Sequence, residues 1–318
     1  ASRRTRLMNS DPASFPFERI VIGVDGTSRA DHAVGQAVEF QRAQKSRLEC
    51  VHAVPLPRSN WPGVSPVRLA TLNAAALTEA WRDRADHLAP ILGIASPNGD
   101  RAVWEERLRV LPGKPTAVLL ERAAHLNADL VMLGGHKRRP LIDFGGTARG
   151  VLAKSPAPVW VQPDEPKPIR RILAAVDLSE ESLATLNMAA RLGRSLGAQV
   201  TVLHAFHLPV FAGTSQVGGD LFGADASLSD LSGAAEERLA TLVEGFDWGG
   251  VEHEECFVRG EPAEEILARQ ETTDLVILGT HGETALASTV LGSVAYTVLK
   301  SSCKPVLALH HSERHWLV

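Results

Sequence analysis

Short aliphatic runs alternate with amphipathic stretches along this chain. The runs RIVIGV (19–24) and RILAAV (171–176) have the length of strands, and their uninterrupted aliphatic character indicates burial on both faces. After the second run, apolar residues recur at helical spacing from Ser179, and Gly197 provides a stop for the predicted helix. The predicted buried stripe of this helix consists of Leu183, Leu186, Ala189, Ala190, Gly193 and Leu196.

The remainder of the chain continues this alternation. A Gly- and Ser-rich stretch at 207–229, and residues 57–68 nearer the N-terminus, are predicted to be long loops. Strands that alternate with helices require right-handed crossovers and a mostly parallel sheet with helices on both faces. In such a sheet, ligands bind at the carboxyl ends of the strands. Further strands are predicted at 200–205, 253–260, 274–279 and 304–310, and further helices at 232–246, 261–271 and 292–302.

The chain also repeats itself. ERIVIGVDGTS (18–28) recurs as RRILAAVDLSE (170–180), and a His-Ala pair recurs at the end of the next predicted strand. Later segments recur in the same order, so one unit of domain size has been duplicated. The first unit is predicted to span residues 17–162 and the second residues 168–312, with a proline-rich, stiff connector between them.

Composition narrows the class of protein. With 318 residues and a formal net charge of -4, the chain can bury more than one core and offers no broad basic surface for nucleic acid. No apolar run approaches the roughly 18 residues of a membrane span, and the basic N-terminus lacks the apolar stretch of a secretory signal. We therefore expect a cytoplasmic protein that binds neither membranes nor nucleic acid. The three cysteines lie far apart, which predicts neither a disulfide framework nor a metal site.

Several segments of the second unit meet at the predicted ligand edge. An aspartate follows the first strand, an alanine ends the second, and two glycines form a turn after the fourth. Glycine lets the backbone turn tightly and approach a ligand closely. A Gly-Ser pair begins the last helix, where free N–H groups and a hydroxyl suit an anion. The predicted site for phosphates and a polar, uncharged group consists of Asp177, Ala205, Gly279, Gly282, Gly292 and Ser293.

The glycines of this site have a specific spacing. Residues 279–293 fit the pattern G-x2-G-x9-G-(S/T), and the flanking segments match as well. In these features the chain resembles a tandem, two-domain member of the universal stress protein family, in which this motif cradles ATP. The resemblance implies two flavodoxin-like (adenine nucleotide alpha hydrolase-like) α/β domains, each with a five-stranded parallel sheet of order 3-2-1-4-5 and helices on both faces. It also implies adenosine contacts by Asp177 and Ala205, and ribose and phosphate contacts by Gly279, Gly282, Gly292, Ser293 and Val294.

The first unit departs from the motif. Lys137 stands where the second glycine is expected, and the stretch up to Gly146-Thr147, the pair matched to the Gly-Ser pair, is one residue shorter. A long side chain there predicts lost or altered nucleotide binding. In the second unit, Glu283 beside a triphosphate is unfavourable without a cation, so ATP, ADP and AMP all stay open, with Mg²⁺ as a candidate bridging ion. The weaker first-unit candidates are Asp25, Ala53, Gly134, Gly146 and Thr147; helix capping explains Asp25 equally well.

The expected function is that of a stress-response nucleotide sensor. The second unit would bind the adenine nucleotide, the first would act as a degenerate pairing partner, and an unidentified protein would read the nucleotide-bound surface. No catalytic residue is assigned, and efficient turnover is not expected. Paired units predict an internal pseudo-dimer, with a homodimer of chains as the open alternative.

Two other functions stay open. The first is an ATP-using enzyme that performs slow hydrolysis, autophosphorylation or nucleotidyl transfer and depends on Ser293. The second is a binding module for a non-nucleotide small molecule or lipid. Its ligand would contact the apolar residues of the two long loops, namely Trp61, Val210, Phe211 and Leu221.

Overall fold

Both units of the chain fold as alternating strands and helices. The computed structural model describes residues 15–56, 65–95, 101–135, 145–207, 228–280 and 291–310. The same succession of elements appears in each unit, which confirms the α/β class predicted from the sequence pattern.

The first unit begins with a buried strand and closes with the strand that meets the second unit. Its described elements are β1 (Arg19–Gly23), α1 (Ser28–Gln44), β2 (Arg47–Val54), α2 (Pro66–Leu92), α3 (Arg101–Arg107), β3 (Leu108–Pro112), α4 (Pro115–Leu126), β4 (Leu130–Gly134), α5 (Gly146–Lys154) and β5 (Val159–Gln162).

The second unit repeats this order after the connector. Its described elements are β6 (Arg171–Ala175), α6 (Ser182–Leu196), β7 (Gln199–Phe206), α8 (Leu228–Glu244), β8 (His253–Arg259), α9 (Pro262–Ala268), the 3₁₀ turn η2 (Gln270–Thr272), β9 (Leu275–Gly279), α10 (Ser293–Ser301) and β10 (Val306–Leu309).

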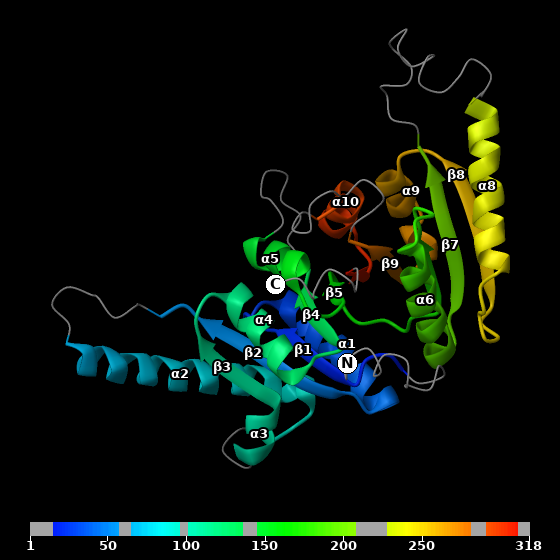
Figure 1. The fold of residues 1–318 in the computed structure, drawn as a ribbon. Coiled ribbons are helices and arrows are strands. Elements are labelled where there is room, and N and C mark those ends of the chain that lie inside the picture. The colour runs from blue at the N-terminus through cyan, green and yellow to red at the C-terminus, as the bar shows by residue number, and fades with distance from the viewer. Residues whose placement is uncertain are drawn as a thin grey trace, which may run out of the picture.

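The described strands form one continuous ten-stranded sheet (Figure 1). Its order is β3-β2-β1-β4-β5-β10-β9-β6-β7-β8, so the two units meet through their last strands. The β5–β10 pair is antiparallel, with Trp160 opposite Leu307 and Val161 opposite Val306, whereas the other described pairs are parallel. The two units therefore form an internal pseudo-dimer, and their carboxyl edges point in opposite directions.

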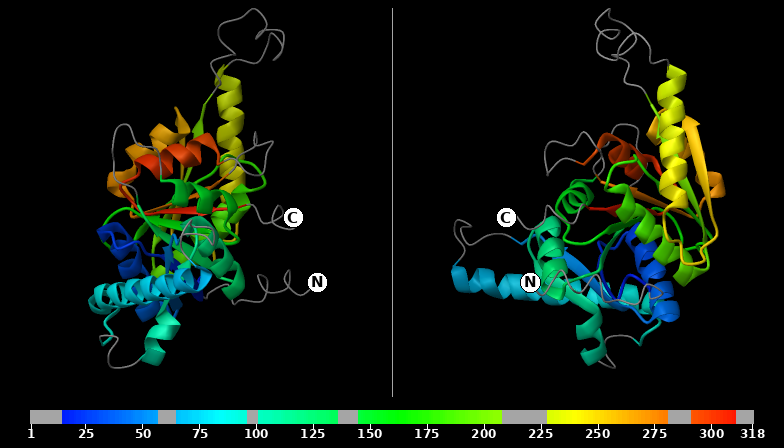
Figure 2. Two further views of the ribbon diagram at one scale, coloured as in Figure 1. Left: turned by 90° about the vertical axis from the view of Figure 1, so that its left-hand side faces the viewer. Right: turned by 45° about the vertical axis from the view of Figure 1, so that its right-hand side comes forward.

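Helices cover both faces of this sheet, as the two views of Figure 2 show. One hydrophobic cluster joins residues of α1, α2, α6 and α8 to the sheet, and a second joins residues of α4, α5, α9 and α10 to its other face. Each cluster contains residues of both units, so the units share their cores. This sharing follows from the continuous sheet, because a helix that packs near β5 or β10 also reaches the neighbouring unit.

Several helix ends follow from local sequence, and others differ from the prediction. Gly197 ends α6 in the left-handed conformation, with φ 65°, as predicted. However, α6 begins at Ser182 rather than Ser179, and Leu183 of the predicted buried stripe is 46% exposed. Residues 66–68, predicted as loop, belong to α2, because Ser65 caps that helix and Pro66 occupies its first turn.

Trp160 forms the centre of the seam between the units. It is fully buried, stacks edge-on against Phe40 at a ring-centroid distance of 5.3 Å, and donates its indole N–H to Gln162 at 2.8 Å. Gln44 at the end of α1 donates to the carbonyl of Ser195 in α6 at 3.0 Å. Trp160 therefore belongs both to the core and to the interface between the units. No helix in the described part of the chain is long and apolar enough to cross a membrane.

Candidate ligand-binding sites

Strand register brings the predicted first-unit residues to one edge of the sheet. Gly23 of β1 pairs with Val51 of β2, so Asp25 and Ala53 follow at the same level beyond that pair. On the other side of β1, the register with β4 places Gly134 at the same edge. The carboxyl ends of β1, β2 and β4 therefore lie together. This is the point at which the strand order changes direction, and parallel sheets bind ligands there.

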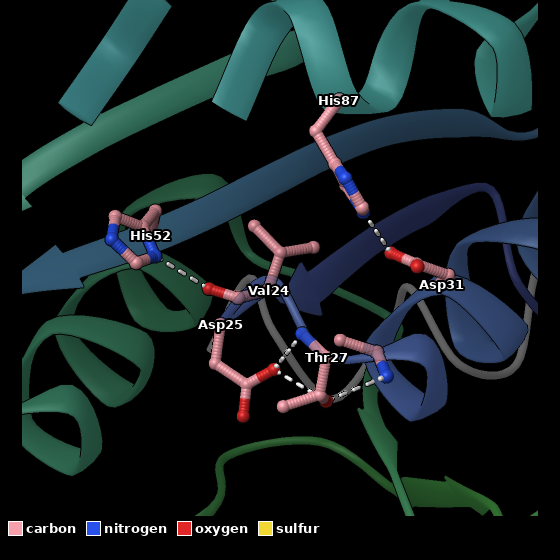
Figure 3. Close-up of polar contacts among 7 residues, drawn as sticks. Val24, Asp25, Thr27, Asp31, His52 and His87 are labelled. Atoms are coloured by element: carbon pink, nitrogen blue, oxygen red, sulfur yellow. Dashed lines mark hydrogen bonds and ion pairs between the residues drawn. The ribbon is translucent and has the colours of Figure 1, made fainter. Parts of the chain in front are cut away.

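The turn after β1 is fixed by Asp25 and His52 (Figure 3). Oδ1 of Asp25 accepts hydrogen bonds from the backbone N–H of Thr27 at 3.0 Å and from its hydroxyl at 2.7 Å. Nδ1 of His52 donates to the carbonyl of Val24 at 2.7 Å, so this histidine is bonded to the neighbouring backbone. The cap of α1 is Thr27, whose hydroxyl accepts from the N–H of Ala30. Asp25 therefore shapes the turn before the helix and is not itself the cap.

The second unit repeats this turn with different side chains. Oδ1 of Asp177 accepts from the N–H of Ser179 at 3.0 Å and from the hydroxyl of Ser182 at 3.0 Å, and His204 donates to the carbonyl of Val176 at 3.0 Å. Leu178 adopts a left-handed φ of 64°, where the first unit has Gly26 at 82°. A leucine in this conformation costs roughly 1 kcal/mol, and such strain concentrates at binding sites.

The glycine segments of the second unit lie against each other. Leu278 pairs with Ala175, which brings Gly279 beside the Asp177 turn, and Ala205 of β7 lies on the opposite side of β6. The N–H of Gly292 donates to the carbonyl of Thr280 at 2.8 Å, so the end of β9 directly contacts the start of α10.

Both last helices of the units begin at a glycine with no capping side chain. Gly292 caps α10 and Gly145 caps α5. The first N–H groups of a helix have no acceptor within it, and no side chain of the cap residue takes them here. Ser293 and Val294 are the first residues of α10, so their N–H groups are available to an anion. The predicted pairing of Gly146 and Thr147 with the Gly-Ser motif is off by one residue, because Gly145 occupies the cap position.

A cavity of about 350 Å³ opens at the first-unit edge. It is within the size range of small-molecule sites. All five weaker candidates line it: Asp25, Ala53, Gly134, Gly146 and Thr147. Sequence reasoning did not identify the other contributors to its wall, among them His52, Pro115, Leu119 and Gly145. Proline and leucine carry no polar side-chain group that would single them out in the sequence as ligand contacts.

Two of the glycines that line the cavity, Gly134 and Gly146, have different physical roles. A Cβ added to Gly134 would lie 2.5 Å from the carbonyl carbon of Arg29 and 2.6 Å from the nitrogen of Ala30. Gly134 is thus needed for the close approach of β4 to the start of α1. A Cβ added to Gly146 would meet nothing within 4 Å. Gly134 therefore has a packing role of its own in the wall of the cavity.

The residues that precede α4 and α9 differ in charge between the two units. Lys114 precedes α4 in the first unit, whereas Glu261 holds the same position before α9. Glu261 pairs with Nε2 of His207 at 3.0 Å, an attraction that requires a protonated imidazole. In the first unit, a hydrogen bond from Arg122 to Glu49 raises the pKa of the Arg122 guanidinium, and this ion pair joins α4 to β2.

Some predicted residues lie outside the described part of the chain. These are Gly282, Glu283, Lys137, and the loop residues Trp61, Val210, Phe211 and Leu221.

Comparison with known proteins supports the assignment of a family. The family model described as "Universal stress protein family" matches residues 16–163 and 168–310. The universal stress protein YxiE of Bacillus subtilis is 28% identical over 143 residues, covering 43% of this chain and 96% of that protein. The universal stress protein Rv2623 of Mycobacterium tuberculosis is 26% identical over 300 residues, covering 92% of this chain and 96% of that protein.

The fold is shared with solved structures as well. A universal stress protein from Archaeoglobus fulgidus superposes with a TM-score of 0.63 at 18% identity, covering 93% of this chain and 99% of that chain. Its coverage matches that of the tandem relative, which spans both units. The chain therefore belongs to the universal stress protein family, as a member with two family domains in tandem.

Proposed function

We propose that this chain is a cytoplasmic stress-response sensor whose second unit binds an adenine nucleotide, ATP, ADP or AMP, while the first unit serves as its pairing partner. The observation that carries the proposal is the contact between Gly292 and Thr280, which joins the end of β9 to the uncapped start of α10. That junction offers N–H donors to phosphates. It lies beside the Asp177 turn, which offers a carboxylate to ribose hydroxyls.

The geometry supports two contact regions for the ligand, the Asp177 turn for the ribose and the start of α10 for the phosphates. Asp177 uses Oδ1 for its own turn, because this oxygen accepts from the hydroxyls of Ser179 and Ser182 and from the N–H of Ser179. Oδ2 is therefore the oxygen proposed for the ligand. Ser293 and Val294 begin α10 and would contact phosphate through backbone N–H groups. A bridging Mg²⁺ would offset the charge between a triphosphate and Glu283. One solved universal stress protein is in complex with cAMP, which is a property of that protein.

The test is a titration of each nucleotide, with and without Mg²⁺, into protein freed of bound ligand, read from the backbone amide signals of Ser293 and Val294. Gly292→Val adds bulk at the cap and is expected to raise the Kd at least tenfold. The matched control is Gly233→Val on α8, where an added Cβ meets nothing within 4 Å. Unchanged affinity in a folded Gly292→Val protein would show that the nucleotide does not bind at this junction.

The alternatives give different results in the same experiment. An ATP-using enzyme would show turnover above background that Ser293→Ala abolishes. A non-nucleotide binding module would show no amide shifts at Ser293 with any adenylate, and a different molecule would co-purify with the protein. An unidentified partner protein, or a homodimer, would be detected as a nucleotide-dependent change in molecular mass.

A further inference from the structure

The seam between the units places second-unit residues beside the first-unit site. Because β5 and β10 are antiparallel, the amino end of β10 lies next to the carboxyl end of β5, with Val306 opposite Val161. Lys304 lies just before β10, and Lys300 lies in the last turn of α10. Both lysines are therefore at the same edge of the sheet as the first-unit cavity. Helices α5 and α10 also pack on the same face of the sheet.

A surface hollow connects these lysines with the first-unit glycine turn. Lys300 and Lys304 line it together with Gly135 and Pro163. Gly135 also lines the 350 Å³ cavity, so the hollow and the cavity share a wall residue. Lysine carries its ammonium on a flexible four-carbon stem, which can span a short distance of this kind.

The arrangement is not repeated at the second-unit site. Aligning the helix caps Gly145 and Gly292 places Ala153 at the counterpart of Lys300 and Ala157 at the counterpart of Lys304. The counterpart of Pro163 is His310, whose Nε2 contacts the carbonyl of Leu152. Lys154 lies one position after the counterpart of Lys300, in the last turn of α5, so each of these two helices ends with a lysine. The lysine without a counterpart is therefore Lys304, at the edge of the unit whose own glycine motif is incomplete.

Neither lysine is held by an ion pair among the described residues. The ammonium of Lys300 lies 5.8 Å from the ring centroid of Tyr296, and the backbone N–H of Lys304 bonds to the hydroxyl of Ser302. Lys300 would also offset the negative end of the α10 dipole, which is a sufficient structural role for that residue. The same explanation does not extend to Lys304, which lies beyond the helix and has alanine as its counterpart.

We propose that Lys300 and Lys304 bind the phosphate of a small ligand whose hydroxyl-bearing part occupies the first-unit cavity. Asp25 lines this cavity, and so does the uncapped start of α5 at Gly145 and Thr147. A phosphate near the start of α5 accepts hydrogen bonds from backbone N–H groups of the first unit and lies beside two ammonium groups of the second unit. The first unit is thereby a ligand site completed across the seam. This inference is independent of nucleotide binding by the second unit.

The test uses the full chain, with ADP and adenosine as probes that differ by the phosphates. Binding is read from the backbone amides of Thr147 and Ala148 for the first unit, and from those of Ser293 and Val294 for the second. We expect Lys300→Gln/Lys304→Gln to raise the Kd for ADP at the first-unit amides about tenfold. The Kd for adenosine at those amides, and the Kd for ADP at the second-unit amides, should stay unchanged. The salt dependence of ADP binding at the first unit should also weaken.

The control removes the same charge elsewhere. Arg82→Gln/Arg238→Gln changes two exposed residues on α2 and α8, which pack on the opposite face of the sheet. Glutamine keeps most of the length of the lysine side chain. The single variant Lys304→Gln also leaves α10 unchanged, so a loss of ADP affinity in that variant reports on binding and not on folding. An equal loss in the control, an unchanged ADP affinity in the folded double variant, or the absence of ADP shifts at Thr147 and Ala148 would overturn the proposal. None of these outcomes depends on whether Ser293 and Val294 respond.

Discussion

Gly134→Ala tests the physical role of the glycine that ends β4. The added Cβ would lie 2.5 Å from the carbonyl carbon of Arg29 and 2.6 Å from the nitrogen of Ala30. Both atoms belong to the backbone at the start of α1, which cannot rotate away as a side chain can. To relieve the contact, β4 and α1 must separate, although α1 is anchored to the same sheet by Ala33, Val34 and Ala37.

The magnitude follows from the cost of overpacking. Forcing extra atoms into a packed interior costs about 1–3 kcal/mol. For a unit of this size, each kcal/mol lowers the melting temperature by about 2–4 °C, so Gly134→Ala should melt roughly 2–12 °C below the wild-type protein. Thermal unfolding followed by far-UV circular dichroism measures this shift, and a urea midpoint provides an independent value.

Gly146→Ala is the matched control because the same atom is added in open space. Nothing lies within 4 Å of its added Cβ, and the residue is helical, where alanine is favoured over glycine by up to about 1 kcal/mol. Its melting temperature should equal or slightly exceed that of the wild type. If Gly134→Ala has the melting temperature of the wild type, or if the melting temperatures of both variants fall equally, the close-packing explanation is wrong.

Three further changes test the turn, the seam and the buried thiol. Thr27→Ala removes the cap of α1 and should cost about 1 kcal/mol in a urea titration; an unchanged midpoint would contradict the capping role. Trp160→Ala should lower the free energy of unfolding by about 3–5 kcal/mol and should destabilise both units together. A loss of stability confined to the first unit would argue against a shared core. Burial raises the pKa of the Cys50 thiol from 9.0 to about 12, so folding favours the protonated form. That contribution is complete below pH 9 and is lost as the pH rises toward 12, so wild-type stability should fall more steeply over this interval than that of Cys50→Ala; parallel curves would refute the assignment.

The local sequence pattern was sufficient to predict the strands and helices and the edge of the sheet at which each site lies. The aliphatic runs at 19–24 and 171–176 contain β1 and β6, since uninterrupted apolar residues are stable only in a strand covered on both faces. Gly197 ends α6 because only a residue tolerant of positive φ fits there at low cost. The duplication and the order of strands and helices then placed Asp25 and Asp177 at the carboxyl edges.

Contacts between distant segments decided the rest. Sequence could not show whether Asp25 caps α1 or shapes the turn before it, because Asp and Thr are both good caps and only geometry assigns the bonds. It also could not show that Gly145 is the N-cap of α5 and Gly146 its first residue, since helix ends shift by a residue without changing the pattern. The reason for Gly134 lies in the backbone of Arg29, more than a hundred positions earlier in the chain.

The sequence by itself determined two similar α/β units, their family motif and the ends of the strands that carry the sites, because these depend on periodicity and spacing within short segments. Only the tertiary structure decided that β5 pairs with β10 inside one chain, that Trp160 joins two cores, and that second-unit lysines lie beside the first-unit cavity. The physical reason is that strand pairing and side-chain packing depend on which surfaces meet across the whole chain, and local periodicity is the same whichever partner a surface finds.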